Sequence, residues 1–282
     1  MITLDSLTLP PAAFNIFAVF SFSFGACIGS FLNVCIWRLP RGESIVRPGS
    51  HCPKCNAAIP WYCNIPILSW LALRGRCKDC GQPISPRYMV VEALTGLLFL
   101  AVFCAFESTD LLLVPVYWLV LSMAVYASFV DIDHYILPDA ATVGGIVAGP
   151  VLSWILPQLQ GCAERMDALL ASLLGALVGF GTLWLVGVLG KLAFRKEAMG
   201  FGDVKLMGAV GALFGWQAAL FTIFASSFLG AFWGLVMIAF GSAKMKSRIP
   251  FGPYLCAGMT LWMFYGPPLV NWYLSLLRHG GI

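Results

Sequence analysis

Long apolar runs separated by short polar segments dominate the chain. The first run covers 12–37 and exceeds the roughly 20 residues that a helix needs to cross a bilayer. Further apolar runs lie at 89–106, 111–130, 140–156, 168–194, 206–240 and 251–277. The run at 206–240 is long enough for two short spans with a turn near Gly215-Trp216, and Pro267-Pro268 interrupts the last run. The pattern predicts an all-α polytopic membrane protein with about eight transmembrane helices.

The composition agrees with this pattern. Of the 282 residues, 60% are hydrophobic and 11% are charged, whereas soluble domains carry about 25% charged residues. A large soluble enzyme is therefore disfavoured. The first ten residues lack a basic stretch, and no small-residue cleavage site follows, so no removable signal peptide is expected.

The basic residues predict the orientation of the chain. With the N-terminus outside, 15 of the 17 lysines and arginines fall on inner segments or at inner helix ends. Such an excess of basic residues marks the cytoplasmic side of a membrane protein. Asp131 and Asp203 then lie at the cytoplasmic ends of their helices.

The long polar segment of the chain, at 38–88, contains two C-x-x-C pairs. Each pair presents two sulfurs to one point, and tetrahedral Zn²⁺ needs four such ligands. A segment of this size builds a poor core, so a metal would supply its folding energy. We expect a structural zinc ion bound by Cys52, Cys55, Cys77 and Cys80. Disulfide or redox pairs are the alternative, His51 is an alternative ligand, and Cys63 has no assigned role.

Two acidic positions stand where apolar runs end at one membrane face. Asp203 closes the stretch Gly200-Phe201-Gly202-Asp203, and Asp131 follows the run at 111–130. An ionisable group at a membrane span is costly to keep, so each acid is a functional hypothesis. Two facing carboxylates share a proton, so one can act as a base on water while the other polarises a scissile carbonyl. The pair predicts an aspartate dyad for hydrolysis.

Other readings of these acids stay open on physical grounds. Asp133 and Asp139 lie close to Asp131 in the sequence and are rival positions for the first catalytic acid. Isolated acids more often cap helices or form ion pairs, and Lys205 and His134 are available as partners.

The same residues belong to a longer series of motifs that runs through almost the whole chain. In chain order the motifs are Gly29-Ser30-Phe31-Leu32-Asn33-Val34 with Arg38-Leu39-Pro40, the two C-x-x-C pairs, Arg87-Tyr88 with Glu92 and Gly96, Asp131 with Leu137-Pro138-Asp139, Gly200-Phe201-Gly202-Asp203-Val204-Lys205, and Pro250-Phe251-Gly252-Pro253. With them the chain resembles the bacterial prepilin peptidases (type 4 prepilin leader peptidase/N-methyltransferases), membrane aspartic proteases of the G-x-G-D type.

The resemblance implies a function and assigns residues to it. The first catalytic acid stands seven positions before Pro138, which is Asp131, and the second closes G-x-G-D, which is Asp203. The enzyme would cleave the basic leader of type IV prepilins and of type II secretion pseudopilins at the cytoplasmic face of the bacterial inner membrane. It would then methylate the new N-terminal amine with S-adenosylmethionine, and Glu92 and Gly96 match positions tied to that activity.

The resemblance also divides the chain and names its partners. Residues 1–37 would form the first transmembrane helix, 38–88 a cytoplasmic zinc loop associated with methyl transfer, and 89–282 the peptidase domain. Prepilins, pseudopilins and membrane lipid are the expected partners, and nucleic acid is not among them.

Two functions of other classes compete with this one. A proton-coupled transporter would also combine many spans with acids at the membrane, but such folds show internal repeats and broken helices at midplane. No convincing repeat is seen, and the acids stand at helix ends. A zinc loop that only binds partners is a third possibility, and it leaves Asp131 and Asp203 unexplained.

Overall fold

The computed structural model describes residues 10–106, 110–195, 199–240 and 249–279. Within these ranges the regular secondary structure is helical, with two isolated β-bridges in the polar loop. The predicted inner segments at 196–198 and 241–248 lie outside the described residues. The chain forms two compact units, Met1–Tyr126 and Ala127–Ile282.

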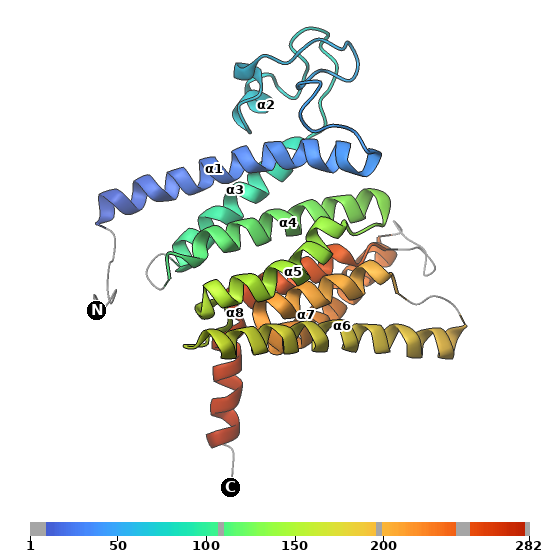
Figure 1. Ribbon diagram of the computed structural model, residues 1–282. Helices are drawn as coiled ribbons and strands as arrows, with labels where there is room; N and C mark the ends of the chain where they lie inside the picture. Colours follow the sequence, from blue (N-terminus) through green and yellow to red (C-terminus); the bar gives the residue numbers. More distant parts are fainter. Residues whose placement is uncertain (1–9, 107–109, 196–198, 241–248, 280–282) are drawn as a thin grey trace. The chain divides into compact units, whose positions relative to one another are not determined.

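The long helices carry the apolar runs (Figure 1). Five helical segments in the described ranges are long and apolar enough to cross a membrane: α1 (Pro11–Arg38) with η1 (Leu39–Arg41), α3 (Arg87–Phe106), α4 (Leu113–His134), α6 (Arg165–Phe194) and α7 (Phe201–Ala239). The shorter α5 (Asp139–Ile155) is also apolar, and α8 (Gly252–His279) is the last helix in the described ranges. The predicted class, an all-α multi-pass membrane protein, is confirmed.

In the first unit, α1 packs against α3 through glycines four residues apart. A Cβ on Gly25 would lie 2.7 Å from Phe99 Cβ, and a Cβ on Gly29 would lie 2.7 Å from Glu92 Cα. Small residues at this spacing let two membrane helices approach closely. Gly25 and Gly29 therefore permit the close packing of α1 on α3.

The start of α4 is held to α3 by an aromatic stack. Trp118 lies parallel to Phe99, with 4.9 Å between the ring centroids, and its Nε1 donates a hydrogen bond to the Phe99 carbonyl at 2.9 Å. The indole therefore satisfies its only donor while it packs against the neighbouring helix.

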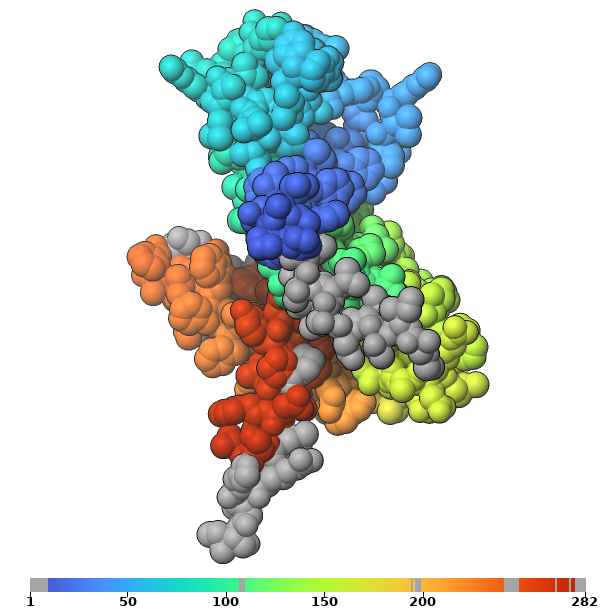
Figure 2. Space-filling view, turned by 90° about the vertical axis from the view of Figure 1, so that its left-hand side faces the viewer, coloured from blue at the N-terminus to red at the C-terminus, as the bar shows by residue number. Residues whose placement is uncertain are grey.

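The polar loop between α1 and α3 belongs to the first unit (light blue to cyan in Figure 2). The helix α1 continues directly into η1, and Gly42 ends η1 because it takes a positive φ of 69°. The loop's own regular structure is limited to η2 (Trp61–Cys63) and the short helix α2 (Leu68–Ala72).

In the second unit, α5 and α6 pack on the first half of α7. An ion pair of 2.8 Å joins Lys205 to Asp139 at the start of both α7 and α5. Further along, a Cβ on Gly145 would lie 2.7 Å from Ala209 Cβ. The paired positions advance together, so α5 and the first half of α7 run parallel, from the same end of the unit.

The helix α7 folds back on itself at Gly215. Gly215 has φ 84° and ψ 173°, which no helical residue adopts. A Cβ on Gly179 of α6 would contact both Met207 and Ala219. In a straight helix these two residues would be about 18 Å apart, so the chain must reverse between them. The predicted turn near Gly215-Trp216 is confirmed.

Gln160, at the end of η3 (Pro157–Gln160), donates hydrogen bonds to backbone carbonyl groups that lose their helical partners at this reversal. Its Nε2 donates to the carbonyls of Ala212 and Leu213, at 2.9 and 3.2 Å. Ser172 of α6 donates a second bond to the Ala212 carbonyl. Backbone carbonyls left unpaired inside a membrane cost several kcal/mol each, so these side chains stabilise the hairpin.

Candidate metal centre and active site

Four cysteine sulfurs meet in the polar loop. The sulfurs all lie within 4.8 Å of one another, and they come from Cys52, Cys55, Cys77 and Cys80. Around a tetrahedral Zn²⁺ with Zn–S bonds of about 2.3 Å, the sulfurs would be about 3.8 Å apart, and the Cys52 and Cys80 sulfurs are 3.9 Å apart. The four residues therefore fit a metal ion, and all are free thiols rather than disulfides.

The local backbone favours the thiolate form of one cysteine of the cluster, Cys52. Backbone N–H groups of Cys55 and Lys54 lower the pKa of the Cys52 thiol to about 6. A lower pKa favours the thiolate, which is the form that binds metals. Among the described residues, neither His51 nor Cys63 belongs to the group of converging ligand atoms.

Both C-x-x-C pairs are held by turns of the same construction. In the first turn Asn56 N donates to Cys52 O at 2.9 Å, and in the second Gly81 N donates to Cys77 O at 3.0 Å. Asn56 and Gly81 both take positive φ, 58° and 68°, and these two residue types tolerate that conformation best. The duplication was readable in the sequence, where Cys52-Pro-Lys-Cys55-Asn and Cys77-Lys-Asp-Cys80-Gly correspond.

The two predicted acids are both buried in the second unit. Asp131 is 6% exposed near the end of α4, and Asp203 is 9% exposed in the first turn of α7. Their charges are close enough to interact. Buried ionisable groups are rare unless they are paired or functional.

Asp131 is held at the start of α8. The backbone N–H of Gly252, the first residue of α8, donates a hydrogen bond of 2.9 Å to Asp131 Oδ2. The start of a helix favours an anion because its free N–H groups point outward. A Cβ on Gly252 would lie 2.7 Å from the same oxygen and 2.8 Å from Leu137 Cδ2, so the contact requires glycine.

Asp203 stands at the start of another helix, α7. Gly200 precedes the helix with an extended backbone, and Asp203 N donates to its carbonyl at 3.1 Å. A Cβ on Gly202 would lie 3.0 Å from Leu137 Cβ. Leu137 thus touches the glycine beside Asp203 and the glycine that binds Asp131, and it joins the two acid-bearing segments.

The rival acids have different surroundings. Asp133 and Asp139 are exposed, and Asp139 forms the ion pair with Lys205. The ion pair that the sequence allowed for Lys205 is therefore made by Asp139. Burial and the bond from Gly252 distinguish Asp131 from both rivals.

Glu92 and Gly96 lie on α3 in the first unit. The buried Glu92 carboxylate accepts a hydrogen bond of 2.8 Å from Ile67 N and another from the Ser30 hydroxyl. A Cβ on Gly96 would lie 3.0 Å from the Phe22 carbonyl oxygen. Glu92 thus ties the polar loop and α1 to α3, while Gly96 permits the close contact of the two helices.

Sequence reasoning did not assign the parts played by Leu137 and Gly252. Both stand inside motifs that carried the resemblance, Leu137-Pro138-Asp139 and Pro250-Phe251-Gly252-Pro253. The signal was therefore present, but the contacts of Leu137 with Gly202 and Gly252, and of Gly252 with Asp131, depend on the folded chain.

Comparisons with known proteins agree with these motifs. Residues 23–106 match the model of the bacterial peptidase A24 N-terminal domain, and residues 118–235 match that of the type IV leader peptidase family. A prepilin leader peptidase/N-methyltransferase of Myxococcus xanthus is 44% identical over 96% of this chain and 79% of its own length. The protein of the same description from Aeromonas hydrophila is 36% identical, over 90% and 92% of the two chains.

A third relative, from Pseudomonas aeruginosa, has the same description and is 34% identical over 96% of this chain and 97% of its own. The chain belongs to the type IV leader peptidase family. The resemblance predicted from the motifs is confirmed, and the protein is an enzyme of the prepilin leader peptidase/N-methyltransferase type. No solved structure matches the chain.

Proposed function

We propose that the protein cleaves the basic leader peptide of type IV prepilins and type II secretion pseudopilins with Asp131 and Asp203 as the catalytic pair. The observation that carries this assignment is the burial of both acids, Asp203 in the first turn of α7 and Asp131 bonded to the first residue of α8. Cleavage takes place at the cytoplasmic face of the bacterial inner membrane, and the apolar helix of the substrate lies in the lipid.

The proposed chemistry needs one ionised and one protonated carboxyl group. The ionised acid removes a proton from water, and the resulting hydroxide attacks the scissile carbonyl carbon while the protonated acid donates a hydrogen bond to the carbonyl oxygen. When the tetrahedral intermediate collapses, the C–N bond breaks and the nitrogen takes a proton from the dyad. The products are the leader carboxylate and a free amine on the mature pilin.

This amine is the acceptor for the second activity. S-adenosylmethionine would supply an activated methyl group to this amine. We assign methyl transfer to the polar loop and its flanks, where Glu92 and Gly96 join the loop, α1 and α3.

We further propose eight spans with the N-terminus outside. The helices α1, α3, α4, α5, α6 and α8 contribute one span each, and the two halves of α7 contribute two. This order places the polar loop and both acids on the cytoplasmic side, in agreement with the distribution of basic residues. Residues 1–37, 38–88 and 89–282 are then the first span, the zinc loop and the peptidase domain.

The test is cleavage of a purified prepilin by single variants at protein levels matched to wild type. We expect Asp131→Asn and Asp203→Asn each to abolish cleavage. The double variant should be no slower than either single variant, because losing one member of the pair already removes the contribution of both to the rate. Asp133→Asn is the matched control, since this acid is exposed on the same helix, and it should keep most activity. Normal processing by Asp203→Asn would refute the mechanism.

A further inference from the structure

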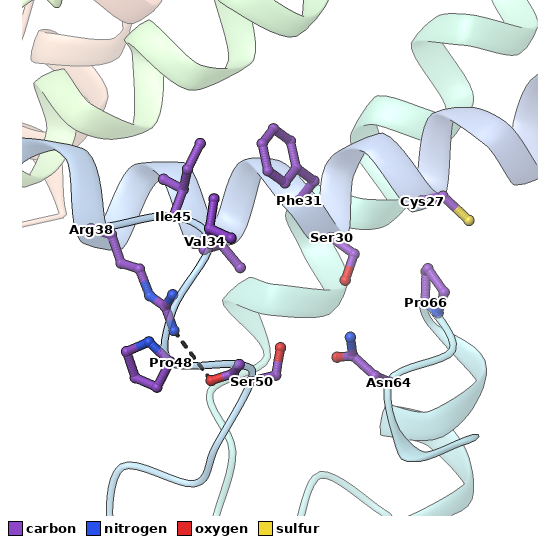
Figure 3. Close-up of a pocket in the computed structure, with 12 residues that line it drawn as sticks. Cys27, Ser30, Phe31, Val34, Arg38, Ile45, Pro48, Ser50, Asn64 and Pro66 are labelled. Atoms are coloured by element: carbon purple, nitrogen blue, oxygen red, sulfur yellow. Dashed lines mark hydrogen bonds between the residues drawn. The ribbon is translucent and has the colours of Figure 1, made fainter. Parts of the chain in front are cut away.

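A cavity of about 390 Å³ lies between the second half of α1 and the polar loop (Figure 3). Its volume is within the range of small-molecule sites, about 300–1,000 Å³. Ser30 of α1 faces Ser50 and Asn64 of the loop across it. The lining residues with hydrogen-bonding or charged groups are Ser30, Arg38, Ser50 and Asn64, and apolar ones include Val34, Ile45 and Pro48.

Arg38 builds one wall of this cavity. It is 8% exposed, and its guanidinium donates to the carbonyls of Ser44 and Gly49, at 3.0 and 3.3 Å. These bonds hold the loop against the end of α1. A guanidinium has five donors, so the two bonds leave this buried cation with capacity to bind an anion.

Glu92 fixes the opposite wall. Its carboxylate accepts bonds from Ser30, which lines the cavity, and from Ile67 N, next to the lining residue Pro66. Ile67 takes a φ of 63°, a strained conformation for a β-branched residue. Strained backbone persists only where its surroundings enforce it, so the bond that Ile67 N donates to Glu92 helps to hold this wall in an unfavourable conformation.

We infer that this cavity binds the methyl donor, S-adenosylmethionine. The inference rests on the proposed function, which requires a donor site. The donor has a carboxylate and an ammonium on one carbon at its amino-acid end, a sulfonium cation, and an adenosyl group with a flat base. Arg38 suits the carboxylate, the polar wall backed by the Glu92 carboxylate suits the sulfonium, and the apolar lining suits the adenosyl group.

A phospholipid is the competing occupant, because its phosphate would also suit Arg38. The headgroup of an anionic lipid such as phosphatidylglycerol offers no cation, whereas this cavity combines one buried cation with a buried carboxylate behind its polar wall. That pairing matches a ligand with charges of both signs. The donor is therefore favoured over an anionic lipid.

The first test measures binding rather than activity. Full-length protein in detergent is titrated calorimetrically with S-adenosylhomocysteine, the product that cannot transfer a methyl group. We expect Ser50→Phe, which fills the cavity, to weaken binding at least about tenfold. Ala58→Phe adds the same ring to an exposed position of the loop outside the cavity and should bind as wild type does.

The second test addresses the carboxylate. We expect Arg38→Gln to weaken binding of S-adenosylhomocysteine about tenfold, the cost of one charge-assisted hydrogen bond. Binding of 5′-methylthioadenosine, which lacks the amino-acid end, should change little. Equal losses for both ligands would overturn the assignment of Arg38 to the carboxylate, because they would mean that the substitution only disturbs the loop.

The outcomes separate this inference from the proposed function. Asp203→Asn should bind S-adenosylhomocysteine normally although cleavage is lost, so failure of the dyad leaves the binding result intact. The inference is overturned if Ser50→Phe binds like wild type or if wild type does not bind. It is also overturned if phosphatidylglycerol displaces the ligand from wild type and Ser50→Phe equally, or if ultraviolet crosslinking of radiolabelled donor marks only peptides outside 27–66.

Discussion

At the scale of single residues, the proposed active site depends on glycines as much as on acids. Gly202 and Gly252 let Leu137 and Asp131 approach the starts of α7 and α8 more closely than any side chain would allow. Since the N–H of Gly252 fixes Asp131, a small displacement there should misplace the carboxylate.

We therefore expect Gly252→Ala to slow cleavage about 10²-fold, because a misplacement of about 1 Å has this effect in other sites. The added methyl group would lie 2.7 Å from Asp131 Oδ2. The measurement is the initial rate of cleavage of a purified prepilin. Gly181→Ala in α6 is the matched control, since a Cβ there meets nothing within 4 Å, and its rate should equal that of wild type. Wild-type activity in Gly252→Ala would contradict this account.

The sequence indicated which acids are candidates for catalysis, but it did not indicate which residues position them. Asp131 and Asp203 were chosen from helix ends and motif positions. Their partners could not be derived, because the bond from Gly252 to Asp131 joins residues 121 positions apart. Physical reasoning also could not rank Asp131 above Asp133, since burial on one face of a helix depends on its neighbours.

At the scale of elements, the sequence pattern predicted more. The break in α7 followed from a run long enough for two short spans. What it did not predict was the role of Gln160, because a single polar residue between two apolar runs gives no sign that it will meet the carbonyls of a distant turn.

The polar loop is the element whose stability should depend on metal. We expect about one zinc ion per chain in the purified protein. Cys52→Ser and Cys80→Ser should each lose most of the metal and make the loop sensitive to protease, because the metal supplies the folding energy of so small a segment. Elemental analysis and limited proteolysis measure the two effects.

Cys63→Ser provides the control for these variants. Cys63 lies in the same loop but outside the group of converging sulfurs, so its replacement should leave the zinc content unchanged. Full zinc retention in a variant that lacks all four clustered cysteines would exclude this metal site.

At the scale of the whole molecule, the direction of the helices decides where the chemistry takes place. In the second unit the ion pair between Asp139 and Lys205 marks the end at which α5 and α7 begin, and Asp203 stands in the first turn of α7 at that end. Gln160 and Gly215 mark the opposite end. A prepilin leader is basic and is made in the cytoplasm, so the proposed function requires the first end to face inward.

This requirement can be tested with epitope tags inserted at two exposed turn glycines, Gly42 and Gly161. Both have positive φ, and neither has another atom within 4 Å of the position of a Cβ, so a short insertion should disturb little. With eight spans and an outer N-terminus, the tag at Gly161 should react with antibody in intact spheroplasts, and the tag at Gly42 only after lysis. The physical reason is that this orientation keeps 15 of 17 basic residues inside. Reactivity of the Gly42 tag in intact spheroplasts would instead place the polar loop outside, away from the newly made leader.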